Sequence, residues 1–313
     1  MSEKVATRHH LENVPLASPS TTSGLLEAFR RRYLLRLMVR REIQARYARS
    51  LFGLAWSYIN PTVRFFTFYF VFGILLQRGN IQNFAIHLFA GMVLVNLFVE
   101  SFNSGTRSIM QNKAVVQKMP LPREIFPLAS TLVTLYHTGP QMVILIGACF
   151  ATGSFEPDVV GMLAALLGFG IVILLGTGMG LMFSAVNVMY RDLTRVVRIF
   201  TGMVPFAVPM MYPWTLVQTR FEDFPVIAQL YLLNPIAEAV LLIQRGFWIT
   251  TVSDEDAAAA GGEYGFTPGL DANFPDDLYS RGLIMLGCSV VFLVFAQWVF
   301  TRLDDKIPDR LVA

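Results

Sequence analysis

Long apolar blocks, separated by short polar segments, constrain the fold of this 313-residue chain more than any other feature. Hydrophobic residues make up 54% of the sequence and charged residues 15%, against roughly 25% charged residues in soluble domains. A helix of roughly 20 residues crosses the hydrocarbon core of a bilayer. Lipid offers no hydrogen-bond partners, so each block must satisfy its own backbone as a helix. The sequence therefore predicts an all-α polytopic integral membrane protein.

Six blocks are long enough to be transmembrane helices. Their predicted ranges are 51–76, 84–102, 125–150, 159–189, 199–217 and 282–300. The fourth is longer than a perpendicular span needs, so it should tilt or project into the cytoplasm. The fifth contains Pro205, Pro209 and Pro213. Because each proline removes a backbone donor, this block should be a kinked or broken helix.

The flanking segments differ from the blocks in composition. Residues 1–23 are polar and rich in Ser and Thr, which predicts a disordered cytoplasmic leader. Residues 24–50 are dense in arginine, with apolar residues on one helical face, and predict an amphipathic interface helix at the membrane surface. A solvated helix with snorkelling arginines is the alternative. We assign 51–301 to the transmembrane domain and 302–313 to a cytoplasmic tail.

Basic residues are distributed asymmetrically among the connecting segments. Those on the proposed cytoplasmic side are Arg30, Arg31, Arg32, Arg36, Arg40, Arg41, Arg46, Arg49, Arg107, Lys113, Lys118, Arg123, Arg191, Arg195 and Arg198. The segments after the first and third blocks contain only Arg78 between them. By the positive-inside rule, both termini are therefore expected in the cytoplasm of a multi-pass protein of the plasma (inner) membrane.

Residues 224–243 are apolar enough to span the membrane, yet the segments on either side of them are both expected outside the cell. The stretch 253–277 contains seven acidic residues and no basic one, so it is expected outside together with the end of the fifth span. Asn234-Pro235 supplies a break between the two helices of the expected hairpin. We therefore predict re-entrant extracytoplasmic helices between spans five and six, with a true seventh span as the alternative.

Several kinds of chemistry find no support in the sequence. A P-loop needs lysine after glycine, and none of the four lysines follows one. Cys149 and Cys288 both lie inside apolar blocks, and no metal-binding spacing occurs. The spans offer Arg64, Glu100 and His137, which support a proton relay only thinly. We expect no catalytic residues, no metal and no cofactor in this chain.

Aromatic residues are concentrated in the first block. Phe65, Tyr69 and Phe72 share one helical face, whereas Phe66 and Phe70 lie on the opposite one. Aromatic rings suit the C–H faces of sugars, but they also pack against lipid or neighbouring helices. If these aromatic residues contact sugars, the expected substrate path comprises Trp56, Tyr58, Phe65, Tyr69, Phe72, Tyr212 and Trp214. Phe66 and Phe70 are expected to meet lipid or neighbouring spans.

Four stretches in order resemble one family. They are RREIQARYARSLFGLAWSYINPT (40–62), NKAVVQKMPLPREIFP (112–127), NVMYRDLTRVV (187–197), and VPMMYP with YLLNPIAEAVLLIQRGFW (208–213 and 231–248). From about residue 30 to its end, the chain is similar to ABC-2 type membrane subunits that export polysaccharides such as O-antigen, capsule, teichoic acid or galactan. The acidic insert 253–277 is longer than expected for that family.

This resemblance implies a permease subunit that exports a lipid-linked (polyprenyl-diphosphate) polysaccharide for cell-wall or surface biogenesis. Two copies would form the pore, with two copies of a cytoplasmic ATPase subunit that binds ATP and Mg²⁺; nucleic acid would play no part. The resemblance assigns ATPase coupling to Arg107, Lys113, Lys118, Arg123, Arg191 and Asp192. It assigns the re-entrant gate to Tyr231, Asn234 and Pro235.

Two other hypotheses about the function remain open from the sequence. An ABC-2 type drug or lipid exporter would share the fold but not the cargo. An ATP-independent flippase or a membrane-embedded glycan enzyme would belong to a different class, and its purified chain would be active alone.

Overall fold

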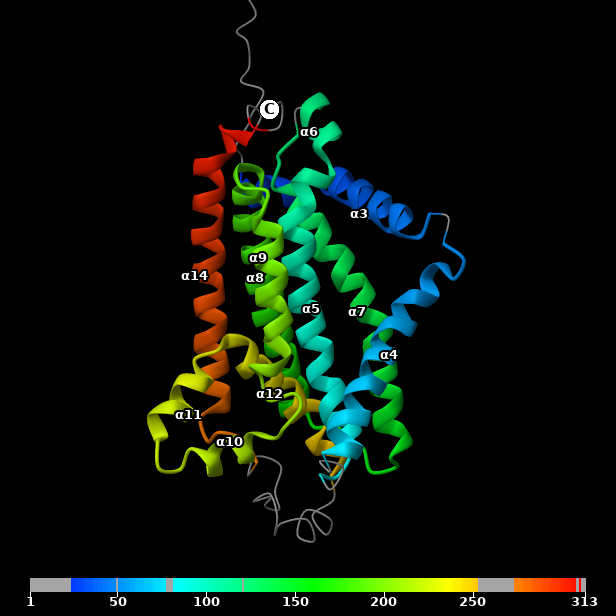
Figure 1. Cartoon of the computed structure of the whole chain (residues 1–313), viewed down its shortest axis with the longest axis vertical. Helices are drawn as coiled ribbons and strands as arrows, with labels where there is room; N and C mark the ends of the chain where they lie inside the picture. Colours follow the sequence, from blue (N-terminus) through cyan, green and yellow to red (C-terminus); the bar gives the residue numbers. More distant parts are fainter. Residues whose placement is uncertain are drawn as a thin grey trace, which may run out of the picture.

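The computed structural model describes residues 24–48, 50–76, 81–119, 121–252, 273–307 and 310 of the chain. The described part is helical and contains no β-strand. Long helices run side by side, and shorter helices gather at the two ends of this bundle (Figure 1). The predicted leader and most of the acidic insert lie outside the described residues.

Four helices among the described residues are long and apolar enough to cross a membrane. They are α5 (Phe84–Gln111), α7 (Ile125–Ala151), α8 (Val159–Met189) and α14 (Leu278–Asp304). These match the second, third, fourth and sixth predicted blocks. The α5 and α14 helices extend beyond the predicted ranges, because their polar ends also remain helical.

The first predicted block is a helix with two geometries. A short 3-10 turn, Gly53–Ala55, leads into α4 (Trp56–Phe68), which continues as the π-helix η2 (Tyr69–Leu75). The helix proper therefore begins at residue 56 rather than at the predicted 51. Pro61 lies inside α4, five residues after its start, and the helix continues past it although proline donates no backbone hydrogen bond.

The fifth predicted block is broken, as the prolines indicate, but its bounds were wrong. The α9 helix runs from Leu193 to Met203, six residues earlier than predicted, and ends in the 3-10 turn η4 (Val204–Phe206). Irregular backbone follows up to α10 (Trp214–Arg220). The helix stops at Pro205 because proline cannot donate the next backbone hydrogen bond. Its early start was missed because basic residues suggested a loop.

A sharply bent pair of helices follows. The α11 helix (Pro225–Leu232) and α12 (Pro235–Phe247, extended by the 3-10 turn Ile249–Thr251) meet at an angle of 80°. Asn234 caps α12, because its Oδ1 accepts a hydrogen bond from the Ile236 N–H (3.0 Å). Pro235 occupies the first helical turn, where no donor is needed. The predicted break at Asn234-Pro235 is therefore present.

Two helices, not one, form the N-terminal segment. They are α2 (Gly24–Arg30) and α3 (Arg32–Tyr47), and α3 lies across the ends of the long helices, at the same end as α6 (Lys113–Lys118) (Figure 1). Ala28 and Leu35 are buried in an apolar cluster with residues of α5, α7, α8 and α14. This burial anchors the N-terminal helices to the bundle.

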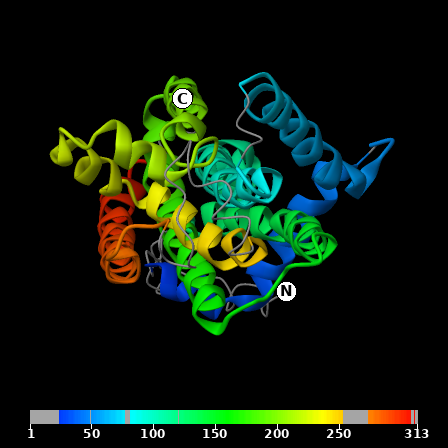
Figure 2. The ribbon, with the colours of Figure 1, turned by 90° about the horizontal axis from the view of Figure 1, so that it is seen from below.

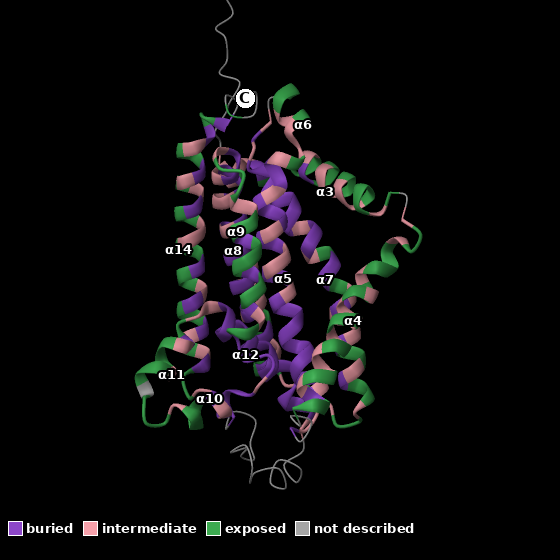
Figure 3. Ribbon diagram, viewed as in Figure 1, coloured by how far each residue is buried: buried purple, intermediate pink, exposed green. Residues whose placement is uncertain are grey.

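The α5 and α12 helices form the most buried part of the bundle, drawn mainly in purple in Figure 3, and both pack against α8. Small residues permit their close approach: a Cβ added at Gly105 would lie 2.7 Å from the Gly180 Cα, and one at Gly246 would lie 2.6 Å from the Gly161 carbonyl oxygen. Close backbone contact of this kind is typical of helix packing in membranes. Figure 2 shows α4 and α14 at opposite edges of the bundle.

Candidate functional site

A polar stripe runs along one face of α5. Asn96, Glu100, Asn103 and Arg107 follow one another at spacings of four, three and four residues, which places them on one side of the helix. Gly105, which faces α8, lies on the opposite side. The α5 helix therefore presents a small-residue face to α8 and a polar face away from it.

Two neighbouring cavities lie along this polar face. The first has a volume of about 340 Å³ and lies between the end of α3, α4, α5 and α7. The second, of about 410 Å³, lies between α4, α5, α9 and η4. Both are lined by Arg64, Asn96, Val99 and Glu100, so the two cavities adjoin each other. We call the two cavities together the polar groove.

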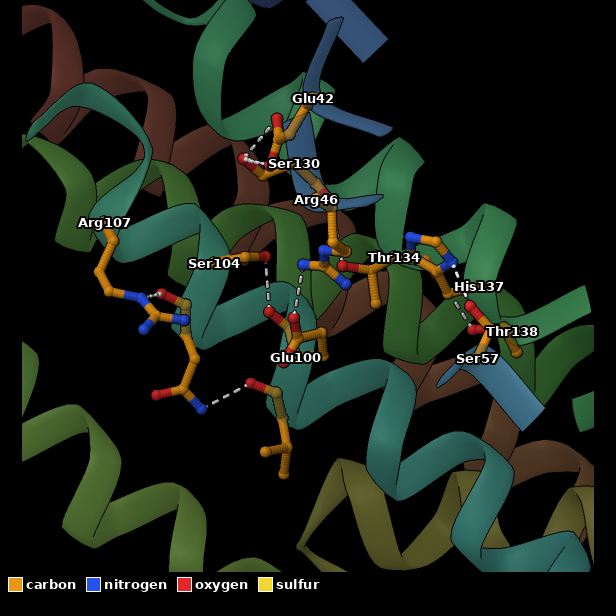
Figure 4. Close-up of polar contacts among 12 residues, drawn as sticks. Glu42, Arg46, Ser57, Glu100, Ser104, Arg107, Ser130, Thr134, His137 and Thr138 are labelled. Atoms are coloured by element: carbon orange, nitrogen blue, oxygen red, sulfur yellow. Dashed lines mark hydrogen bonds and ion pairs between the residues drawn. The ribbon is translucent and has the colours of Figure 1, made fainter. Parts of the chain in front are cut away.

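Hydrogen bonds join the walls of the polar groove. Arg46 Nη2, from α3, lies 2.8 Å from Glu100 Oε1 on α5 (Figure 4). Arg64 Nη1, from α4, donates to Asn96 Oδ1 (2.8 Å), and Asn96 Nδ2 donates to Gln141 Oε1 on α7 (3.2 Å). These bonds connect four helices through side chains that a larger polar ligand can also contact.

A second contact ties the end of α3 to the start of α4. His137 Nδ1, on α7, lies 3.0 Å from both the Tyr47 hydroxyl and the Ser57 hydroxyl, and Figure 4 shows the Ser57 contact. Tyr47 ends α3 and Ser57 lies in the first turn of α4. The turn between the interface helix and α4 is therefore held by one histidine of α7.

Positive charge dominates the polar groove. Four arginines line it, namely Arg46, Arg64, Arg107 and Arg198. Glu100 is the one acidic side chain among the lining residues of the two cavities, and it pairs with Arg46. Arginine within a membrane-spanning region is costly and marks a functional path for polar or charged groups. The polar groove is thus suited to an anionic ligand rich in hydrogen-bonding groups.

Glu42 lies beside the groove on the interface helix. The Ser130 hydroxyl donates to its carboxylate (3.2 Å), as drawn in Figure 4. Burial raises the pKa of Glu42, because desolvation penalises its charged form, while the Ser130 bond and the nearby Arg46 oppose this shift. Glu42 therefore carries a proton more readily than an exposed glutamate.

The predicted path residues of α4 take two positions. Trp56 lines the polar groove, and Tyr58 is 41% exposed. The Phe65 ring packs edge-on against Phe89 of α5. Tyr69 and Phe72 also contact the core, Tyr69 by stacking on Phe84, whereas Phe66 and Phe70 are exposed. None of Phe65, Tyr69 and Phe72 lines either cavity of the groove, so their assignment to the path stays a prediction.

The remaining predicted path residues meet the predicted gate at the other end of the bundle. The Tyr212 and Tyr231 hydroxyls lie 3.2 Å apart, and Trp214 stacks on Tyr231. Asn234 Nδ2 donates to the Ala207 carbonyl (3.2 Å), joining α12 to the irregular segment after η4. The structure thus gathers these four residues into one cluster, separate from Trp56 and Tyr58.

The predicted coupling residues divide into exposed and enclosed groups. Lys118, Arg191 and Asp192 are exposed at the end of the bundle that also carries α3. Lys113 begins α6, and Arg107 lies in the groove wall. Arg123 is enclosed instead: its Nη1 lies 2.7 Å from Asp304 Oδ1 of α14, and both side chains are at most 10% exposed.

Sequence reasoning missed most of the polar groove. Arg46, Asn96 and Asn103 were not assigned to a site, Arg198 was counted only among the basic residues of a cytoplasmic segment, and Arg64, Glu100 and His137 were considered only for proton transfer. The four-three-four spacing on α5 is visible in the sequence and is the signal that could have found this wall. The contribution of α3 could not be found in this way, because Arg46 and Glu100 are 54 positions apart.

The groove carries no arrangement that would hold a metal ion. No group of three or more His, Cys, Asp or Glu side chains with suitable geometry occurs in the described part of the chain. Apolar helices around a polar, arginine-lined groove define the class of the protein: a membrane protein that handles polar or charged molecules.

Comparison with known proteins identifies the family. The family model for the ABC-2 type transporter matches residues 33–244, and the chain belongs to that family. The resemblance found in the sequence is therefore confirmed. It is 26% identical over 212 residues to the O-antigen export system permease protein RfbA of Klebsiella pneumoniae, covering 66% of this chain and 77% of that protein.

Two further relatives carry related names. The chain is 25% identical over 238 residues to the O-antigen export system permease protein RfbA of Myxococcus xanthus, covering 75% and 87% of the two chains. It is 22% identical over 204 residues to the polysialic acid transport protein KpsM of Escherichia coli, covering 64% and 76%. These relatives are permease or transport proteins for polysaccharides.

Proposed function

We propose that this chain is the permease subunit of an ABC exporter that moves a polysaccharide across the plasma membrane. The polysaccharide is linked to a polyprenyl diphosphate, and a separate ATPase subunit supplies the energy. Membership of the ABC-2 family and similarity to O-antigen and polysialic acid transport proteins support this proposal. The chain itself is a transporter subunit rather than an enzyme.

The arginine-lined groove is the observation that carries the proposal. Arg64 and Arg198 can pair with the oxygens of a diphosphate, because guanidinium groups match phosphate geometry. Asn96, Asn103 and Gln141 supply amide groups for sugar hydroxyls. An apolar drug could make no hydrogen bonds with these side chains, so the groove favours a hydrated, anionic cargo.

The proposed topology has six spans. Four are α5, α7, α8 and α14, and the other two are the α4–η2 helix and the broken segment that runs from α9 through η4 and the irregular backbone after it. The bent α11–α12 pair then enters and leaves from the extracytoplasmic side. Since α3 and α6 carry the basic residues at one end of the bundle, that end and both termini are cytoplasmic.

The pore requires two copies of the chain. Beside the groove, α4, η2 and α9 expose large apolar side chains, including Phe66 (61%), Phe70 (53%) and Ile199 (69%). A second copy facing these helices would enclose the groove and give the glycan a path bounded on all sides. Two permease and two ATPase subunits complete the proposed assembly.

The ATPase subunits would bind at the cytoplasmic end. Lys118, Arg191 and Asp192 are exposed there and offer contacts for a soluble partner. No lysine of this chain follows a glycine, so a P-loop lysine must come from the partner. ATP and Mg²⁺ would accordingly be bound by the partner, and no cofactor by this chain.

Reconstitution tests the proposal. The chain and its candidate ATPase are co-purified, placed in proteoliposomes and supplied with a lipid-linked glycan and ATP. Export is expected only when both subunits are present, and the double variant Arg64→Gln Arg198→Gln should reduce it at least tenfold if it removes two phosphate contacts. Arg220→Gln is a control for loss of positive charge outside the groove, because Arg220 is exposed and lines neither cavity.

The proposal fails if the double variant exports glycan at the rate of the control while the complex remains intact. It also fails if the chain alone hydrolyses ATP, because a permease subunit supplies no nucleotide site.

A further inference from the structure

A separate groove lies between the N-terminal helices and α7. Its volume is about 550 Å³, and Phe29, Leu35, Val39 and Leu132 supply its apolar walls. Leu132 comes from α7, whereas the others come from α2 and α3. We call it the α3–α7 groove. None of its lining residues belongs to the polar groove.

All charged residues that line the α3–α7 groove are positive. Arg30, Arg32 and Arg36 line the α3–α7 groove, and no acidic residue does. All three side chains are exposed, and they make no ion pair with a described residue. Arg31 differs, because it pairs with Glu27 (3.0 Å). The rim of the groove therefore offers three cationic groups for an anionic ligand.

Below the groove, α7 continues as one exposed face. Tyr136, Val143, Ile146 and Phe150 are 38–66% exposed. At 100° per residue, all four lie within about 40° of Leu132 around the helix axis. Gly139 and Gly147 lie close to the same face, and a Cβ added at either would meet no atom within 4 Å. An exposed, mainly apolar face of α7 thus leads away from the arginines, and an acyl chain can lie along it.

The dimensions fit one leaflet of a bilayer. The rise from Leu132 to Val143 is roughly 16 Å, at 1.5 Å per residue. Half the hydrocarbon core of a bilayer is about 15 Å thick. An acyl chain on this face would therefore reach from the arginine rim to the middle of the membrane.

We propose that the α3–α7 groove binds an anionic glycerophospholipid. The phosphate pairs with Arg32 and Arg36, and one acyl chain lies along Leu132, Gly139 and Val143. The bound lipid fills the space between α3 and α7, so it fixes the interface helix against the bundle. This site is distinct from the cargo path and does not depend on which glycan is exported.

Lipid retention tests the site without any transport assay. The purified chain is reconstituted in nanodiscs of equal parts phosphatidylcholine and phosphatidylglycerol, extracted in detergent, and its bound lipids are measured by native mass spectrometry. Each arginine near anionic lipid contributes about a fivefold gain in affinity. Arg32→Gln Arg36→Gln should therefore lower bound phosphatidylglycerol by at least tenfold relative to phosphatidylcholine.

Two further variants separate the site from general charge. Arg40→Gln Arg302→Gln removes the same number of charges, but neither residue lines the groove, so retention should stay close to the unmodified level. Leu132→Trp fills the groove without a charge change and should also reduce retention. Equal loss in the charge-matched control would show surface attraction only, and unchanged retention in both groove variants would overturn the proposal.

Discussion

The two faces of α5 follow opposite packing rules. Toward α8, Gly105 meets Gly180 so closely that a Cβ would lie 2.7 Å from backbone, and Ser101 contacts Gly176. Toward α4 and α9, the same helix presents Asn96, Glu100 and Asn103 to open space. One face is closed by small residues and the other kept open by polar ones.

This difference separates a rigid half of the subunit from a half that can rearrange. Backbone contact between α5 and α8 leaves no room for sliding or insertion of water. The α4 and α9 helices meet α5 partly through hydrogen bonds, such as Arg64 to Asn96 (2.8 Å) and Asn103 Nδ2 to Thr201 Oγ1 (2.9 Å). Those bonds can be exchanged for bonds to a passing glycan.

The strongest way to break the closed face is to enlarge Gly105. Gly105→Leu should prevent stable folding, and Gly105→Ala should lower the free energy of unfolding by about 1–3 kcal/mol, because the added Cβ meets backbone that cannot yield. Thermal unfolding in detergent measures this. Gly202→Ala on α9 is the matched control, since its Cβ would meet nothing within 4 Å. Equal stability of the two alanine variants would contradict close α5–α8 contact.

A smaller loss of stability is expected where α12 joins α8. Arg245 is 3% exposed and its Nη2 lies 3.1 Å from Asp158 Oδ2, which is on a 30% exposed side chain. Arg245→Met should destabilise the protein by about 2 kcal/mol, less than a fully buried pair would lose, because water reaches Asp158. Adding Asp158→Asn should recover part of this loss. A further loss in the double variant would show that the two residues act independently.

On the open face, transport should respond more than stability. Asn96→Leu removes the acceptor of Arg64 and a donor to Gln141. Export in proteoliposomes should fall about tenfold, because one hydrogen bond to a charged group is worth about 1.5–3 kcal/mol. Thermal stability should change by less than about 1 kcal/mol, since the site is open to water. A large drop in stability with normal export would place Asn96 in a structural role.

The smallest expected effect concerns pH. The pKa of Glu42 is raised above its ordinary value of 4.5, so ionising it costs stability as pH rises through and above that value. Glu42→Gln should therefore raise stability at pH 7 by less than about 1 kcal/mol, and the gain should vanish as pH falls below 4.5. Unfolding curves across this pH range measure the difference. A gain that grows at low pH would contradict the sign.

Apolar continuity made the long helices predictable. The fourth block and α8 share the same ends, Val159 and Met189, because Asp158 caps a run without charged residues by accepting from the Gly161 N–H (2.9 Å). The second block was predicted to end at Phe102 because the residues after it are polar. The α5 helix instead continues to Gln111, and some of these polar residues line the groove. A change from apolar to polar residues therefore does not by itself show whether a helix ends or continues with a polar face.

Other features depend on contacts between distant segments. The division of the N-terminal helix at Arg31 and the position of Arg46 next to Glu100 follow from how α3 lies on the bundle. No local pattern encodes that placement. Likewise, the aromatic face of Phe65 and Tyr69 was predicted from spacing, but its neighbours on α5 could be found only from the structure.

Thiol accessibility tests most directly whether the polar face of α5 lines a water-filled path. Single cysteines are placed at Asn96 and Val291 in a chain carrying Cys149→Ala and Cys288→Ala, and treated with a charged thiol reagent in proteoliposomes. Val291, on α14, is 69% exposed and faces lipid in our account, whereas Asn96 lines the groove. We predict fast labelling at position 96 and none at 291. Labelling at 291 but not at 96 would contradict the assignment of the groove as the transport path.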